Sequence, residues 1–316
     1  MKAFLLLVLG VLVFAASPAI AQQAPGFADQ LLGRWDITVK GADGVSYPSW
    51  MELHLRTEQS LMADFVGRFG SHRHATQVEY KDGQLTVSIP RQYEVGPDVL
   101  VFIGRMEAGK LAGTVKDEKG NTLNWTAVRA PELKSAEKVA WGAPIKLFNG
   151  KDLTGWKQRH NDHPNCWMVE GGILSNKTPC SDLISDQKFT DFKIHVEFQV
   201  VPKGNSGVYL RGRYETQIQD DFGRALDTLR MGGVYGFIKP SSAAMKKAGE
   251  WQAYDITLIG RRVTVVLNGV TIINNEEIPG ITGGALDSNE GEPGPIMLQG
   301  DHTRVQFRNV TITPAK

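Results

Sequence analysis

Residues 191–200, DFKIHVEFQV, decide the fold class of this protein. Apolar residues alternate there with polar ones without interruption, at Phe192, Ile194, Val196, Phe198 and Val200. Because successive side chains of a β-strand point to opposite faces, the pattern predicts a strand with one face in a core and the other in water or a groove. Long helical periodicity is almost absent from the rest of the chain, so we predict an all-β protein.

The C-terminal half contains about a dozen short segments of this kind, separated by turn residues. Asn268-Gly269, for example, is a hairpin signal between the β-branched runs 263–267 and 270–273. A two-sheet sandwich or jelly roll accommodates so many strands most economically. We place this unit at residues 144–316.

A smaller set of alternating segments precedes this unit. Asp82-Gly83 and Gly120-Asn121 mark tight connections between consecutive strands. The expected strands are residues 35–39, 51–56, 77–80, 84–89, 99–105 and 123–128. They predict a small antiparallel β-barrel or half-barrel at residues 27–130, followed by a Pro-bearing and charged linker at residues 131–143.

Composition excludes several classes of protein. The 316 residues are 41% hydrophobic, and 35 Lys and Arg balance 34 Asp and Glu. A disordered chain would be less apolar, and a nucleic-acid or anionic-membrane binder would carry a clear basic excess. We expect a globular protein with no nucleic-acid partner; the sequence does not indicate an oligomeric state.

Residues 1–21 have the pattern of a secretory signal peptide. Lys2 precedes an apolar run at residues 4–16, and Ala19-Ile20-Ala21 forms a small-x-small cleavage site. The run is shorter than the roughly 20 residues needed to span a bilayer, and no later segment could do so. We therefore expect a periplasmic or secreted protein without a membrane segment after cleavage.

The two cysteines, Cys166 and Cys180, both lie in the part predicted to be exported. An even number in an oxidising compartment favours one disulfide, worth roughly 3 kcal/mol in the chain-entropy model. Two buried free thiols or a metal pair are the alternatives, although two cysteines do not by themselves make a zinc site.

The most informative polar segment follows the turn Gly204-Asn205-Ser206-Gly207. If residues 208–220 form one regular strand, a polar stripe lies on one of its faces: Tyr209, Arg211, Arg213, Glu215, Gln217 and Gln219. Arg beside a carboxylate keeps it ionised, and a rigidly held carboxylate suits a general base. The alternative is a solvated outer face with cross-strand ion pairs.

Two other clusters have weaker chemical signals. His72-Arg73-His74 places two imidazoles on one face of a strand, with His54 elsewhere in the same unit. No carboxylate or Cys completes a metal site there in sequence, so we expect a surface pair. The acidic residues 287–292 are interpreted as a solvated loop, with a Ca²⁺ site as the alternative.

Four separated motifs carry a resemblance to a known family: residues 147–156, 167–174, 204–218 and 293–302 with 307–310. In this order they resemble the 3-keto-disaccharide hydrolase domain family over about residues 144–316. The resemblance implies a concanavalin-like jelly roll. Residues 27–130 lie outside it and have no assigned role.

The resemblance implies a hydrolase that cleaves the glycosidic bond of 3-keto-disaccharides or 3-keto-glucosides. The C3 ketone acidifies the hydrogen on C2, so a base can form an enolate, the C1 substituent is expelled, and water adds to the enone. Such a site needs a base, an enolate stabiliser and an acid. By motif position, Glu215 is the candidate base, Arg211 or a bound cation the stabiliser, and His302 the candidate acid.

The remaining motif positions suggest how a sugar would be held. Asn205, Gln217 and Gln299 are candidates for hydrogen bonds to hydroxyls, and Tyr235 and Lys239 for the wall of the groove. No cofactor is required by these residues, and a divalent metal ion is the alternative to Arg211.

Two other functions compete with this one. A non-catalytic carbohydrate-binding module could use the same fold, although it has little use for a buried carboxylate. A retaining glucanase would need a Glu-x-Asp-x-x-Glu strand with two carboxyls about 5 Å apart. Here Gln217 and Asp220 stand where that pattern has its Asp and second Glu.

Overall fold

The computed structural model describes residues 29–57, 60–93, 98–117, 119–133, 138–161, 165–177 and 180–316. The predicted signal peptide, residues 1–21, and residues 134–137 of the predicted linker lie outside the described residues. All regular elements in the described part are β-strands, and none of its segments is a helix long and apolar enough to span a bilayer. The prediction of an all-β protein is confirmed.

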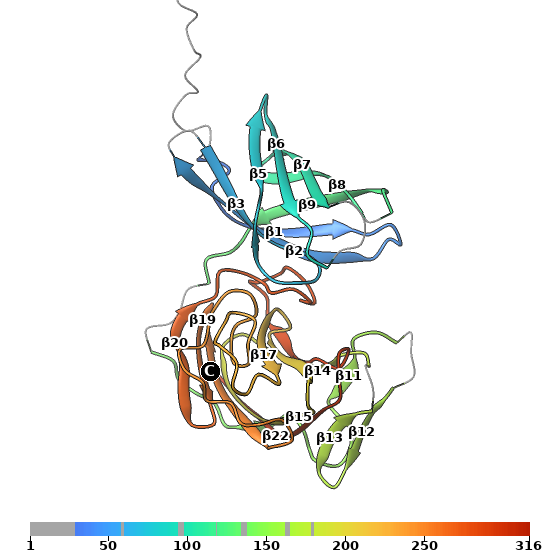
Figure 1. The fold of residues 1–316 in the computed structure, drawn as a ribbon, viewed down its shortest axis with the longest axis vertical. Coiled ribbons are helices and arrows are strands. Elements are labelled where there is room, and N and C mark those ends of the chain that lie inside the picture. The colour runs from blue at the N-terminus through green and yellow to red at the C-terminus, as the bar shows by residue number, and fades with distance from the viewer. Residues whose placement is uncertain are drawn as a thin grey trace, which may run out of the picture.

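The N-terminal unit is a nine-stranded antiparallel sheet, drawn in blue to green in Figure 1. Its strands in chain order are β1 (Gly33–Lys40), β2 (Ser46–Thr57), β3 (Ser60–Val66), β4 (Arg73–His74), β5 (Gln77–Lys81), β6 (Gln84–Pro90), β7 (Val99–Glu107), β8 (Lys110–Lys116) and β9 (Thr122–Arg129). The spatial order runs from β4 through β1 and β9 to β5. The corner between β4 and β5 links the two ends of the sheet: the Ala75 amide donates to Ala63 of β3, and the Thr76 amide to Ser88 of β6. The sheet therefore curls into the predicted barrel.

Alternation places one face of this sheet inside the barrel. Trp35, Ile37 and Val39 of β1 are buried there. All six expected strands form, whereas β3, β4 and β8 were not among the expectations. The β8 sequence contains Gly113, whose Cα is in such close contact with the neighbouring strand that a Cβ would lie 1.8 Å from the Ile103 carbonyl oxygen.

The C-terminal unit is a jelly roll of two antiparallel sheets, drawn in yellow-green to red in Figure 1. The larger, eight-stranded sheet contains β10 (Ile145–Lys146), β12 (Trp167–Glu170), β13 (Ile173–Asn176), β15 (Phe192–Val200), β18 (Gln252–Ile259), β19 (Arg262–Leu267), β20 (Val270–Glu277) and β22 (Val305–Pro314). β15 lies between β22 and β18, and its five apolar side chains are buried as the alternation predicts.

The smaller, five-stranded sheet carries the polar segment. It contains β11 (Trp156–Gln158), β14 (Leu183–Phe189), β16 (Asn205–Leu210), β17 (Tyr214–Gln219) and β21 (Gly294–Leu298). The expectation of one strand through residues 208–220 is wrong, because Arg211 and Gly212 adopt positive φ angles of 53° and 67° and turn the chain into a β16–β17 hairpin. Tyr209 pairs directly with Glu215, and Gly207 with Gln217, so these residues still share one face of the sheet.

The barrel is fixed to the jelly roll by buried contacts. Trp50 of β2 is fully buried in the core of the jelly roll, edge-on to Phe237 with 5.5 Å between ring centroids. Its indole lies so close to Gly280 that a Cβ there would be 2.2 Å from Nε1. Beside it, Asp36 of β1 is buried near Glu290; burial and this neighbouring negative charge raise the pKa of Asp36 to about 9.

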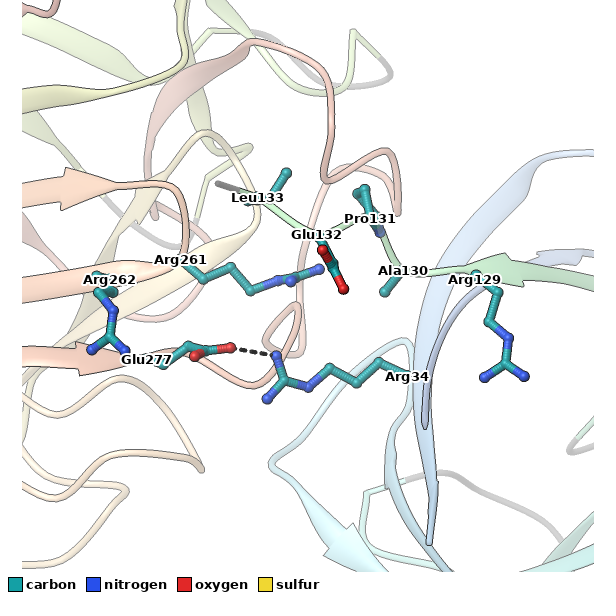
Figure 2. Close-up of a pocket in the computed structure, with 9 residues that line it drawn as sticks. All are labelled: Arg34, Arg129, Ala130, Pro131, Glu132, Leu133, Arg261, Arg262 and Glu277. Atoms are coloured by element: carbon teal, nitrogen blue, oxygen red, sulfur yellow. Dashed lines mark hydrogen bonds and ion pairs between the residues drawn. The ribbon is translucent and has the colours of Figure 1, made fainter. Parts of the chain in front are cut away.

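A cavity of about 510 Å³ lies at the junction of the two units and the linker (Figure 2). Arg34 of the barrel reaches across it to Glu277 of β20, with 2.7 Å between Nη1 and Oε1. Arg261 on another wall is paired with Glu290 at 2.7 Å. The Arg34–Glu277 pair joins the two units, whereas Arg261 and Glu290 both belong to the jelly roll. The cavity contains none of the candidate catalytic residues.

Candidate active site

Two of the three candidate catalytic residues, Glu215 and His302, line a second cavity, of about 420 Å³. Both units line it: Phe69, Gly70 and Tyr93 from the barrel, and Arg159, Asp182, Asn205, Tyr209, Glu215, Gln217, Tyr235, Gly283, Gly284, Gln299, Asp301 and His302 from the jelly roll. This volume is within the usual range for sites that hold small ligands. Most of the lining side chains are polar, as a site for a sugar requires.

Glu215 of β17 is the most buried carboxyl group in this lining, with 3% of the residue exposed. Burial raises its pKa to about 8, while a hydrogen bond from the Tyr209 hydroxyl and the positive charge of His302 act in the opposite direction. Tyr209 Oη lies 2.9 Å from Glu215 Oε2. A carboxyl group with a pKa near neutrality is suited to take a proton and to return it.

Two neighbours fix the position of this carboxyl group. Gly207 on β16 leaves the space that this carboxyl group occupies, because a Cβ there would lie 2.2 Å from Glu215 Oε1 and displace the side chain. Tyr209 Oη is also 2.9 Å from the Gly283 carbonyl oxygen. When Glu215 is protonated, it can donate to Tyr209 while Tyr209 donates to Gly283; when Glu215 is ionised, Tyr209 can donate to it instead. The same hydroxyl thus accommodates both protonation states.

A second titratable group, His302, lines the same cavity. His302 is close to Asp301, and hydrogen bonding of its Nδ1 to that carboxylate is the main cause of its raised pKa. Asp182, behind them, has a pKa raised by burial and by Asp301. Arg159 holds Asp182 at 3.2 Å and donates to the Gly284 carbonyl at 2.8 Å. The cavity therefore contains a cationic guanidinium and a histidine whose positive form is favoured.

Three side-chain amides of the lining have an oxygen that is buried without a hydrogen-bond partner among the described residues. These oxygens are Asn205 Oδ1, Gln217 Oε1 and Gln299 Oε1. Buried polar groups in folded proteins normally have partners, because desolvating an unpaired one costs about 1–3 kcal/mol. The structure thus brings together the three amides that the sequence indicated as hydroxyl readers, with hydrogen-bonding capacity to spare.

Of the two residues predicted to form the wall of the groove, Tyr235 and Lys239, one lines the cavity and the other does not. Tyr235 lines the cavity, and burial and the nearby Tyr93 and Glu215 raise its pKa. Lys239, four residues further on, is exposed and does not line the cavity. Phe69, Gly70 and Tyr93 were not predicted, because they come from the barrel and only the tertiary fold places them here.

Arg211 does not lie beside Glu215, contrary to expectation. At the β16–β17 turn its guanidinium points away from the cavity, into a buried cluster where Nη2 donates to the Gly260 carbonyl at 2.5 Å and the group stacks over Tyr214. The turn breaks the stripe, so the side chain of Arg211 cannot continue the face that Tyr209 and Glu215 share. Arg159 is the guanidinium that the structure places in the cavity instead.

The two cysteines form a disulfide near the rim of the cavity. Cys166 and Cys180 are joined, with 6.1 Å between their Cα atoms. The Cys180 amide donates to the carbonyl of Gly300, which directly precedes Asp301 and His302. The disulfide therefore helps to fix the segment that carries the histidine.

Metal ligands are not gathered in this cavity. Within the described ranges, one group of three His, Cys, Asp or Glu residues has ligand atoms within 4.8 Å of one another, and it lies in the barrel: Asp64, His72 and His74. The acidic residues 287–292 are not the solvated loop we expected. Asp287 pairs with Arg213 at 2.7 Å, and Glu290 is fully buried against Arg261.

Comparison with known proteins places the jelly roll in a family. A family model described as a 3-keto-alpha-glucoside-1,2-lyase-like domain matches residues 143–313, which is more than half of the chain. The chain belongs to this family. The barrel precedes the matched region, so the lyase-like domain accounts for the jelly roll and most of the cavity but not for Phe69, Gly70 and Tyr93.

Individual relatives of the lyase-like domain are more distant. A 3-keto-disaccharide hydrolase from Bacteroides thetaiotaomicron is 28% identical over 137 residues, covering 38% of this chain and 47% of that protein. The chain thus matches about half the length of this relative. Crystal structures of two candidate glycosyl hydrolases from Parabacteroides distasonis cover 57% and 55% of this chain and 92% and 94% of their own chains, with 30% and 22% identity and TM-scores of 0.46.

Proposed function

We propose that this protein hydrolyses the glycosidic bond of 3-keto-disaccharides or 3-keto-glucosides. The observation that carries the proposal is Glu215, a buried carboxyl group with a pKa of about 8 in a cavity lined by three side-chain amides whose oxygens have no partner among the described residues. Membership of the 3-keto-alpha-glucoside-1,2-lyase-like domain family supports the same class of substrate. A proton on carbon next to a ketone is weakly acidic, so its removal benefits from a base with a pKa near neutrality.

In the proposed reaction, Glu215 takes the proton from C2 of the keto sugar. The electron pair of that C–H bond forms an enolate with the C3 oxygen. The bond from C1 to the glycosidic oxygen then breaks, and the departing oxygen takes a proton from His302, whose pKa is raised. Water then adds its oxygen to C1 of the resulting enone and gives a proton to His302, while the protonated Glu215 returns a proton to C2, so that both residues regain their starting states. The net change is consumption of one water and release of two products.

The enolate needs a positive or hydrogen-bonding partner, and we assign this role to Arg159. Its guanidinium lines the cavity and is partly exposed to it, whereas that of Arg211 is buried elsewhere. Asn205, Gln217 and Gln299 would hold the sugar hydroxyls through their free amide oxygens. Each such group orients C2 relative to Glu215, which is where positioning contributes most to rate.

The decisive experiment is a paired incubation of the purified protein with a 3-keto-glucoside and with the same sugar unoxidised. We expect release of the aglycone from the keto sugar alone. Glu215→Gln should lower kcat by about 10²–10⁴-fold, the usual contribution of a general base. Asp220→Asn is the matched control, because Asp220 accepts from the Lys203 amide outside the cavity. Full turnover by Glu215→Gln would remove Glu215 as the base.

The same incubation distinguishes the two competing functions. Cleavage of the unoxidised sugar would favour a retaining glucanase, and tight binding without cleavage of either sugar would favour a carbohydrate-binding module. The position of Asp220 argues against the glucanase, since it lies outside the cavity that contains Glu215.

We further propose that the protein acts in the periplasm or outside the cell. The pattern of residues 1–21 and the disulfide between Cys166 and Cys180 support this location. Cell fractionation with detection of a mature chain beginning near residue 22 tests it; a full-length chain in the cytoplasmic fraction would contradict it.

A further inference from the structure

A group of imidazoles surrounds one carboxylate on the outer face of the barrel. Asp64 of β3 pairs directly with His74 of β4, and Glu52 on its other side brings β2 alongside. His54 follows Glu52 by two residues, so it projects from the same face. His72, two residues before His74, completes the group. The pairing of β2, β3 and β4 thus places the Asp64 carboxylate beside His72 and His74, which have no carboxylate near them in sequence.

The separations between these side chains suit a first-row metal ion. Asp64 Oδ1 lies 3.2 Å from His72 Nε2 and 2.5 Å from His74 Nδ1. His54 Nδ1 is 3.8 Å from the other carboxylate oxygen. With metal–ligand bonds of about 2.0–2.1 Å, the ligand atoms of a tetrahedral Zn²⁺ site lie about 3.3 Å apart. Small side-chain adjustments around Asp64 would therefore admit an ion.

We propose that Asp64, His72 and His74 bind a divalent transition-metal ion, with Zn²⁺ as the ion of best fit and His54 as an available fourth ligand. Imidazole and carboxylate donors with this spacing favour Zn²⁺ over Ca²⁺ or Mg²⁺, which prefer oxygen ligands alone. Asp64 is half-buried, whereas His74 is largely exposed, so an ion can reach the group from solvent.

The proposed site is separate from the sugar cavity but adjacent to its rim. None of its ligands lines the cavity. The ring of His72 lies against Phe237 of the jelly roll, with 5.2 Å between centroids, and Tyr235 of that same loop lines the cavity. On the barrel side, Phe69 and Gly70 precede His72 by three and two residues. A bound ion would therefore fix the barrel segment that forms part of the rim.

Calorimetric titration of Zn²⁺ into the untagged, chelator-treated full chain tests this proposal in the absence of any sugar. We expect one ion per chain, with a raised Tm for the loaded protein. His74→Ala and Asp64→Asn should each weaken the Kd by more than about tenfold. Substitution of the exposed His74 leaves the core untouched, so this variant should fold normally.

His195→Ala is the matched control. His195 also faces carboxylates on an outer sheet face, with Asp255 at 2.7 Å and Glu197 at 3.7 Å, but it has no second imidazole. It should bind Zn²⁺ as the unmodified protein does. Absence of binding, unchanged binding by His74→Ala and Asp64→Asn, or equal weakening by His195→Ala would each overturn the proposal. Because no sugar is present, these outcomes are independent of the proposed hydrolysis.

Discussion

The pKa of Glu215 is set by effects of opposite sign, so a change in either effect should shift it. Burial raises its pKa, whereas the Tyr209 hydroxyl stabilises the ionised form by donating a hydrogen bond. Glu215 works as the base only when ionised, and His302 works as the acid only when protonated. We therefore expect kcat/KM for a keto sugar to rise as Glu215 ionises, around pH 8, and to fall again at higher pH as His302 loses its proton.

Removal of the Tyr209 hydroxyl should move this rise to higher pH. Tyr209→Phe deletes the hydrogen bond that lowers the pKa of Glu215, so the acidic limb of the kcat/KM profile shifts upwards. Measurement of the profile from pH 5 to 10, roughly the range in which such groups titrate, checks the shift. Tyr235→Phe is the control, because Tyr235 lines the same cavity but Tyr209 is the tyrosine that donates to Glu215. An unchanged or lowered limb in Tyr209→Phe would contradict this account.

At the scale of elements, the side-chain amides whose oxygens lack a partner among the described residues lie at the ends of strands β16 and β21 and within β17. A function that requires free hydrogen-bonding groups there lowers stability, since each is desolvated without a protein partner. Strand ends are where a sheet can present such side chains while its backbone stays paired. The backbone N–H of Gln299, for example, still donates to the Gly207 carbonyl oxygen.

Gln299→Met tests whether this amide lowers the stability of the fold while it strengthens binding of the sugar. We expect the unfolding free energy to stay the same or rise by about 1 kcal/mol, while the KM for the keto sugar rises roughly threefold to tenfold. Denaturant titration and steady-state kinetics measure the two effects. Gln252→Met is the control, because the Gln252 side-chain amide is also buried but its oxygen accepts from Lys246 and Asn268. It should lose stability and keep its KM; loss of stability in Gln299→Met would show that its amide has a structural role.

Alternation predicted the faces of strands better than their ends. It placed Tyr209, Glu215 and Gln217 on one face, which is correct, because residues that pair across a two-strand hairpin share a face. It failed for Arg211, since the turn there depends on Gly212 and on a positive φ at Arg211 itself, and no Asn-Gly or Asp-Gly pair marks it. A single internal glycine is a weak turn signal.

Contacts between residues that are distant in sequence could not be predicted from local sequence patterns. Asp64 lies on β3, whose sequence SLMADFV has an apolar-rich rather than a strictly alternating pattern, so neither the strand nor the carboxylate beside His74 was expected. Phe69 and Tyr93 reach the sugar cavity because the barrel docks on the jelly roll. Nothing in their own sequence surroundings indicates this.

At the scale of the whole molecule, Trp50 couples the stability of the barrel to that of the jelly roll. Its side chain belongs to the core of the other unit, where it contacts Phe237 and fits against Gly280. Trp50→Ala should lower the unfolding free energy by about 3–5 kcal/mol. Calorimetry should show one transition for the unmodified protein and two for the variant, because the units then unfold separately. A single transition at an unchanged Tm in the variant would contradict this coupling.

The barrel also contributes Phe69 to the lining of the cavity. This side chain lines the cavity, yet it is 54% exposed, so its removal should hardly change the Tm. If the keto sugar binds in this cavity, the Phe69 ring would cover one side of it, so we expect Phe69→Ala to raise the KM several-fold. Val45→Ala, an exposed apolar substitution elsewhere on the barrel, is the control. Equal KM values for the two variants would remove Phe69 from the binding site.

The burial of Trp50 in the jelly roll has a practical consequence for expressing the jelly roll without the barrel. A fragment limited to residues 143–313 would match its family model in full and still carry Glu215 and His302. It would also expose the apolar hollow around Phe237 and Gly280 to water, and it would lack one side of the rim. Exposed hollows of this kind attract further copies of the same chain. We therefore expect the fragment to aggregate during purification, and a loss of activity in it would reflect the missing cover rather than the chemistry of its carboxyl group.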